Sequence, residues 1–129
     1  MLTFRQAVGK MEGWGKPGTR PTLNNNPGDL TYCQETIHFG ALKGDPRFAV
    51  FPDEATGWEA LRRWFSVPAK FDPSGKLVGG YCGATIEQAI NRFCPAGDGA
   101  NDPNAYTNFV CEQTGHQPTD ILTQEMIDA

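Results

Sequence analysis

The sequence predicts an α+β fold in which helices predominate beside a small antiparallel sheet. Apolar residues recur at helical spacing in four segments, which predicts amphipathic helices. Between the first two of these segments, short apolar runs alternate with glycine and Asp-Pro turns, a pattern typical of antiparallel strands. The chain has 129 residues, enough for one hydrophobic core, and we expect a single domain over residues 1–129.

The first predicted helix begins after Thr3 and ends before Gly13. Thr3 and Gln6 have the spacing of a capping box, in which each side chain bonds the backbone of the other residue. The apolar face of this helix comprises Phe4, Ala7, Val8 and Met11. Gly13 and Gly15 then end the helix.

Three short runs are expected to supply a two- or three-stranded antiparallel sheet, namely Leu30–Tyr32, Ile37–Phe39 and Phe48–Phe51. The turns between them contain glycine and an Asp-Pro pair, which favour chain reversal. Asp53 ends this region and is expected to cap the second helix, because an aspartate side chain can accept bonds from the first backbone N–H groups of a helix.

The remaining helices are predicted from their end signals. Thr85 and Gln88 repeat the capping box and start a third helix. Asp102-Pro103 starts a fourth, since proline is favoured at the first helical position, and Gly115 ends it. A last helix is expected to run from Pro118–Asp120 to the end of the chain.

The charge balance excludes some classes of partner. The chain has 15 acidic and 11 basic residues, for a net charge of −4. An acidic chain lacks the usual footprint of a duplex nucleic-acid binder, and it is not drawn to an anionic membrane or cell wall by charge alone. Apolar runs are far shorter than a bilayer span, so we expect no membrane insertion, and we predict no signal peptide. We expect a monomer without a cofactor.

The four cysteines leave two interpretations open. None belongs to a C-x-x-C pair and the two histidines are far apart, so we expect no metal site. A Cys82–Cys94 disulfide is the pairing we favour if the protein works outside the cytoplasm. Buried thiols are an equally good interpretation, because cores accommodate cysteine well.

Glu12 is the first candidate for chemistry. It lies at the end of the first predicted helix, beside the apolar face and directly before Gly13 and Trp14. The helix dipole and desolvation beside a tryptophan both favour the protonated carboxyl that a general acid requires. Position alone would favour a solvated glutamate at a helix end. The neighbouring glycines favour a site instead, because they let a ligand approach the backbone.

The most unusual stretch is Asn24-Asn25-Asn26-Pro27-Gly28-Asp29-Leu30. Three consecutive amides offer donors and acceptors suited to the hydroxyl and acetamido groups of a sugar. The Pro-Gly pair fixes a turn at this point. A turn whose asparagines only bond its own backbone is an equally good interpretation.

Five segments, spread in order along most of the chain, together form a recognisable pattern: Glu12-Gly13, Asn24–Leu30, Arg47–Pro52, Thr56–Leu61 and Thr85–Ile90. The loop from Cys94 to Asp102 and the residue Tyr106 continue it. The pattern resembles a family of bacterial and phage cell-wall lysins in the lysozyme-like superfamily, which includes goose-type lysozymes and lytic transglycosylases. The Asn-rich segment is the most specific part of the match.

The resemblance implies a lysozyme-like fold with a cleft between the helices and the small sheet. It implies cleavage of the β-1,4 bond between N-acetylmuramic acid and N-acetylglucosamine, with Glu12 as the general acid. The residues that it places along the substrate are Asn24, Asn25, Asn26, Phe51 and Tyr106. The expected partner is the glycan strand of peptidoglycan, and the expected place of action is outside the cytoplasm.

Several alternatives stay open. A hydrolase needs a water, often held by a second carboxylate, for which Asp29 and Glu35 are the candidates, although Asp29 is better suited to capping its own turn. A lytic transglycosylase needs no second carboxylate, because the sugar's own 6-hydroxyl attacks. Chitin is another possible substrate. A different class is a glycan-binding or phage structural module without activity.

Overall fold

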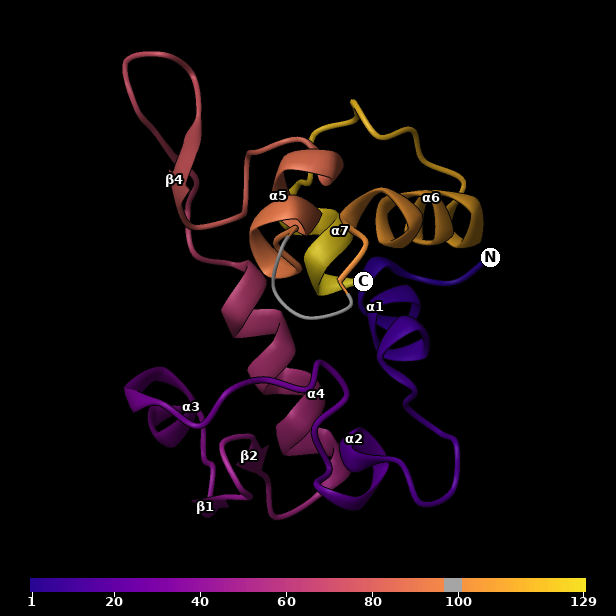
Figure 1. Ribbon diagram of the computed structural model, residues 1–129, viewed down its shortest axis with the longest axis vertical. Coiled ribbons are helices and arrows are strands. Elements are labelled where there is room, and N and C mark those ends of the chain that lie inside the picture. The colour runs from indigo at the N-terminus through magenta and orange to yellow at the C-terminus, as the bar shows by residue number, and fades with distance from the viewer. Residues whose placement is uncertain (97–100) are drawn as a thin grey trace. The chain divides into compact units, whose positions relative to one another are not determined.

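The computed structural model describes residues 1–96 and 101–129, and this part of the chain is mainly helical with two small antiparallel sheets (Figure 1). The predicted α+β class with dominant helices is confirmed. The described elements are α1 (Phe4–Glu12), α2 (Arg20–Leu23), α3 (Gln34–His38), β1 (Lys43–Gly44), β2 (Ala49–Val50), α4 (Glu54–Phe65), β3 (Lys70–Phe71), β4 (Leu77–Gly79), α5 (Ile86–Phe93), α6 (Pro103–Thr114) and α7 (Gln124–Asp128).

The chain forms two compact units, one of residues 8–64 and one of residues 1–7 together with 65–129. Residues 97–100, in the loop from Cys94 to Asp102 that extends the family resemblance, lie outside the described residues. None of the helices in the described ranges is long and apolar enough to cross a membrane.

In the unit of residues 8–64, α4 supplies much of the core. Ala60 and Leu61 of this helix are fully buried, as is Ala49 of β2. Strand β2 pairs with β1 in antiparallel register, Lys43 opposite Val50. Helix α4 begins as predicted, because Asp53 Oδ1 accepts a 2.8 Å bond from the backbone N–H of Thr56.

The predicted strand at Ile37–Phe39 is wrong, because this run belongs to α3 and its C-cap. Thr36 explains the difference. Its side chain is fully buried, accepts a 2.9 Å bond from the backbone N–H of Cys33, and donates a 2.8 Å bond to the carbonyl of Thr31. This anchor starts a helical turn and leaves Ile37 about half exposed, at 49%.

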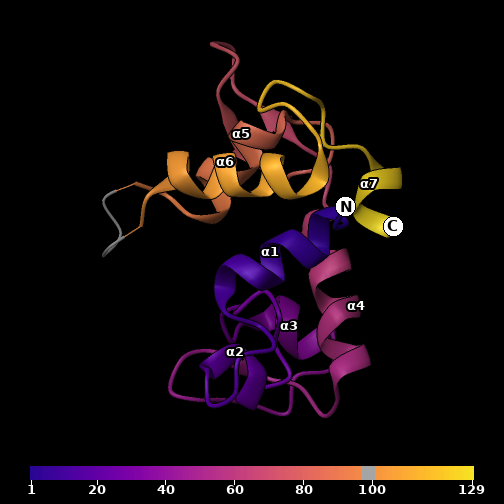
Figure 2. The same cartoon turned by 90° about the vertical axis from the view of Figure 1, so that its right-hand side faces the viewer.

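In the unit of residues 1–7 and 65–129, α5 packs against α6 (Figure 2). The predicted capping box of α5 is present, and Asp102 caps α6 by accepting a bond from the N–H of Ala105. Gly115 ends α6 in the left-handed conformation, with φ 75°. An aromatic cluster fills the core around Phe65, whose ring centroid lies 5.1 Å from that of Tyr81.

One helix boundary and one buried position differ from expectation. The last helix begins at Gln124 rather than at 118–120, because Asp120 closes a turn with Gln117 and Ile121 pairs with Thr85 in an isolated β-bridge. Helix α1 has the predicted capping box and ends at the predicted glycines. Met11, however, is 39% exposed and does not belong to its buried face.

Candidate functional site

Glu12 is half-buried at the last position of α1. Gly13 follows it with φ 95°, a conformation that glycine adopts without strain. The Gly13 carbonyl accepts a 2.9 Å bond from the hydroxyl of Thr19, and the N–H of Gly15 donates a 3.0 Å bond to the hydroxyl of Thr22. These bonds tie the turn after Glu12 to the start of α2.

Two tryptophans pack beside the end of α1. Trp14 lies edge-to-face with Trp58 of α4, with ring centroids 5.7 Å apart. Gly9 makes this packing possible, because a Cβ at that position would lie 2.8 Å from the Trp58 ring. Two indole rings therefore pack against the last turns of α1, around Gly9.

Arg20 brings the helix end and the Asn-rich turn together. Its guanidinium binds the Asp29 carboxylate through both oxygens, with Nε–Oδ1 at 2.9 Å and Nη2–Oδ2 at 2.5 Å. The Asp29 side chain is only 8% exposed, whereas that of Arg20 is 49% exposed. The guanidinium carbon also lies 3.6 Å from the ring centroid of Phe48, a cation–π contact.

The charge of Glu12 acts on this pair. The hydrogen bond that Arg20 donates to Asp29 is the largest cause that raises the pKa of Arg20, and burial opposes it. The negative charges of Asp29 and then Glu12 raise the pKa further. Glu12, Arg20 and Asp29 therefore form one electrostatic cluster, which we call the Arg20 cluster.

Sequence reasoning missed Arg20. The segment of residues 16–28 is rich in Gly, Pro and Asn, and its basic residues are Lys16 and Arg20. This scarcity of positive charge is the only feature of the local sequence that could have pointed to Arg20. Its partner lies nine residues further along the chain, at a spacing that no regular helix or strand brings together.

Asn26 does not face a ligand. It is fully buried, its Nδ2 donates to the carbonyls of Leu30 at 3.0 Å and Ala49 at 2.9 Å, and its Oδ1 accepts from the N–H of Leu30 at 2.9 Å. The predicted substrate contact at Asn26 is therefore wrong. This amide holds the turn against β2, because each of its polar groups already has a backbone partner.

Asn24 and Asn25 behave differently from Asn26. Asn25 adopts φ 51° and donates a 3.2 Å bond to the carbonyl of Phe51. Asn24 is 7% exposed, and its Nδ2 is the one buried side-chain nitrogen or oxygen in the described part of the chain without a hydrogen-bond partner. A buried donor without a partner is costly, so Asn24 is the member of the turn best suited to donate to a ligand or a bound water.

The two aromatic residues expected along the substrate are core residues. Phe51 is 1% exposed, and its backbone N–H donates a 2.9 Å bond to the carbonyl of Asn24. Tyr106 is 3% exposed and packs its ring edge-to-face on Phe93, with centroids 6.3 Å apart. Neither ring offers a face on which a sugar could stack, so both predicted contacts are corrected to packing roles.

The two candidate second carboxylates differ in environment. Asp29 is held by Arg20, as described above. Glu35 lies exposed in the first turn of α3. A hydrogen bond from the Cys33 side chain, followed by one from its own backbone N–H, lowers the pKa of Glu35. Glu35 is therefore ionised at neutral pH.

The predicted Cys82–Cys94 disulfide is not present, because all four cysteines are thiols. Cys82 Sγ donates to Gln124 Oε1 at 3.6 Å, toward α7, while Cys94 is buried at the C-cap of α5. Burial and then the charge of Asp128 raise the pKa of Cys82. The alternative of thiols packed within the fold is the one that the structure shows.

No group of three or more metal-binding side chains converges within residues 1–96 and 101–129. The chain matches no protein-family model, and no curated protein is significantly similar to it.

Proposed function

We propose that this chain is a peptidoglycan lysin of lysozyme-like fold that cleaves the β-1,4 bond between N-acetylmuramic acid and N-acetylglucosamine. Glu12 is the general acid in this proposal. The observation that carries it is the Arg20 cluster, which links the carboxylate at the end of α1 to the Asn-rich turn. The family resemblance of the same two segments supports the assignment.

The proposed reaction begins with proton transfer from Glu12 to the glycosidic oxygen, while positive charge develops at the anomeric carbon. A general acid must hold its proton until that moment, and a neighbouring cation opposes this. Asp29 reduces this effect, because its bidentate pair with Arg20 offsets the positive charge that would otherwise favour ionised Glu12. Asp29 thus acts on the reaction through Arg20 and does not touch the substrate.

The same pair favours a lytic transglycosylase over a hydrolase. Both Asp29 oxygens are engaged by Arg20, so this carboxylate is poorly placed to hold a water. A transglycosylase uses the 6-hydroxyl of the muramic acid as its nucleophile, and Glu12 can take up the proton again as a base. A hydrolase would require another carboxylate, and Glu35, ionised and exposed, is the candidate.

Asn24 is the proposed substrate contact. Its buried Nδ2 can donate to a sugar hydroxyl or an acetamido carbonyl, and this bond would supply the partner that the amide lacks. Binding in this proposal depends on hydrogen bonds rather than on net attraction, since the chain carries a charge of −4. The proposed place of action is outside the cytoplasm, where peptidoglycan lies.

A lysis assay with matched variants tests the proposal. Purified cell walls should lose turbidity with the wild-type protein and retain it with Glu12→Gln, which removes the acid while keeping the side-chain shape. Glu125→Gln, an exposed acid on α7, serves as the control and should lyse walls normally. Wall binding without lysis by the wild type would show a glycan-binding module, and cleavage of chitooligosaccharides alone would show a chitinase. Either result would overturn the proposal.

A further inference from the structure

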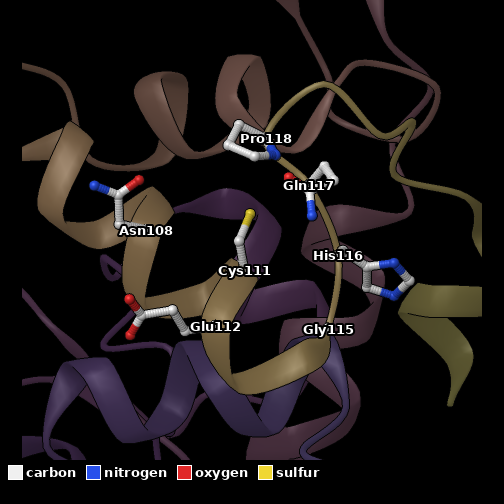
Figure 3. A pocket seen from close by; sticks show the side chains of 7 residues that line it. All are labelled: Asn108, Cys111, Glu112, Gly115, His116, Gln117 and Pro118. Atoms are coloured by element: carbon white, nitrogen blue, oxygen red, sulfur yellow. The ribbon is translucent and has the colours of Figure 1, made fainter.

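A pocket of about 460 Å³ lies in the unit of residues 1–7 and 65–129, between α6 and the segment that follows it. Its volume is in the range of small-ligand sites. Figure 3 shows Cys111 in the middle of the lining residues, with Asn108 and Glu112 on one side and His116 and Gln117 on the other. Gly115 and Pro118 complete the lining.

Negative charge surrounds this pocket. Glu112 lies in its wall. Asp120 accepts a 2.8 Å bond from the backbone N–H of Gln117. The charges of Asp120 and Glu87 both act on the Cys111 thiol, so three carboxylates lie in or near the lining. His116, which lines the pocket and can become cationic, faces Asp120, with Nδ1–Oδ2 at 3.5 Å.

The Cys111 thiol is a second, independent indication of a ligand. Cys111 lines the pocket, is 7% exposed, and makes no hydrogen bond through Sγ within the described residues. Burial, followed by the charges of Asp120 and Glu87, raises the pKa of Cys111. The thiol therefore stays protonated at neutral pH and is a poor nucleophile, so the pocket is suited to binding rather than to covalent chemistry.

We propose that this pocket binds a primary ammonium group carried on the side chain of a peptide, as in a lysine residue. The carboxylate of Glu112 binds the ammonium group, with Glu87 and Asp120 adding long-range attraction. The side-chain amides of Asn108 and Gln117 can bond the peptide groups of the ligand, since each has both a donor and an acceptor. Cys111 Sγ and the Pro118 ring contact the alkyl chain between them.

This site is separate from the proposed glycan chemistry, because its lining contains none of the residues assigned to that reaction. Its test therefore uses binding alone. Isothermal titration with Nα-acetyl-lysine amide measures the affinity of the full chain, and Nα,Nε-diacetyl-lysine amide is the matched ligand without the charge. We expect the acetylated ligand to bind at least 10-fold more weakly, and n-butylammonium, which lacks amides, to bind more weakly as well.

Two variants test whether the charged ligand binds in this pocket. Glu112→Gln should weaken binding of the charged ligand by about 10-fold, while Glu125→Gln, on α7 and outside the pocket lining, should leave it unchanged. Equal affinity for the charged and acetylated ligands, no detectable binding, or an unchanged affinity in Glu112→Gln would overturn the proposal. If n-butylammonium binds as tightly as Nα-acetyl-lysine amide, the part of the proposal that assigns a peptide ligand is overturned. Circular dichroism of both variants establishes that they are folded.

Discussion

The guanidinium of Arg20 holds both carboxylate oxygens of Asp29, at 2.9 Å through Nε and 2.5 Å through Nη2. This pair joins the first residue of α2 to the turn that contains the three asparagines. Asp29 adopts φ 50°, so the turn places a non-glycine residue in the left-handed region to make the contact. Asp29 also offsets the positive charge of Arg20, which would otherwise act uncompensated on Glu12.

Removing Asp29 should impair activity without removing a catalytic residue. In Asp29→Asn, Arg20 loses its ionic partner and its charge acts fully on Glu12, which favours the ionised form of the acid. We expect wall lysis at neutral pH to fall about 10-fold and the pH profile of activity to move toward acid, as measured by turbidity loss between pH 4 and 8.

The double variant Arg20→Gln/Asp29→Asn is the control for that experiment. It removes both charges, so activity at neutral pH should recover toward the wild-type value. A double variant as inactive as Asp29→Asn would contradict the proposed role of the pair. Each single variant should lose about 1 kcal/mol of stability, because the pair is partly exposed to solvent.

Neighbouring asparagines should respond in opposite ways to substitution by alanine. Asn26→Ala removes three buried hydrogen bonds and leaves their backbone partners unsatisfied, so it should destabilise the fold by about 2–4 kcal/mol. Asn24→Ala removes a buried nitrogen that has no partner, so it should change stability little and weaken binding to glycan fragments. Urea unfolding and glycan titrations measure the two effects. A large loss of stability in Asn24→Ala would contradict the assignment.

Gly57→Ala should destabilise the unit of residues 8–64. The first turns of α4 approach the Asn-rich turn so closely that a Cβ at residue 57 would overlap the carbonyl oxygen of Asn25. We expect a loss of about 1–3 kcal/mol, measured by urea unfolding. Gly79→Ala is the matched control, because its new Cβ would make ordinary contacts at 3.6 Å with Lys70. Equal stability of the two variants would show that the close approach is absent.

The cysteines should behave as thiols in solution. Thiol titration of the unfolded chain should count four groups with or without prior reduction, and a reducing agent should leave the melting temperature unchanged. Because the pKa values of Cys82 and Cys111 are raised, their thiolates form only at higher pH. Alkylation of these two residues in the folded protein, followed by peptide mass spectrometry, should be slow at pH 7 and accelerate above pH 9. A count of two in the unreduced chain would contradict this account.

The features predicted correctly from the sequence depend on neighbouring residues. Thr85 and Gln88 lie three positions apart, and Asp102 caps the helix that begins one residue later, so both signals are complete within one helical turn. The end of α1 after Glu12 follows from the glycines beside it. Local steric and hydrogen-bonding preferences determine such features, and they are therefore visible in the sequence.

The features that were missed depend on residues distant in the sequence. Ile37 has the composition of a strand residue, but the buried hydroxyl of Thr36 bonds to Thr31 and places it in a helix. The sequence alone does not identify Phe51 as a core residue, because its burial arises only when the Asn-rich turn folds against it. The Arg20–Asp29 pair likewise exists only after the intervening turn has formed.

The measurement that tests the account most directly is product analysis of digested peptidoglycan by mass spectrometry, with wild type and Glu12→Gln in parallel. We predict new glycan ends at muramic acid, as 1,6-anhydro or reducing sugars. We also predict that Glu12→Gln releases them at least ~100-fold more slowly, the usual contribution of a general acid. Fragments cut only in their peptides, or glycan ends released equally fast by Glu12→Gln, would contradict the proposal.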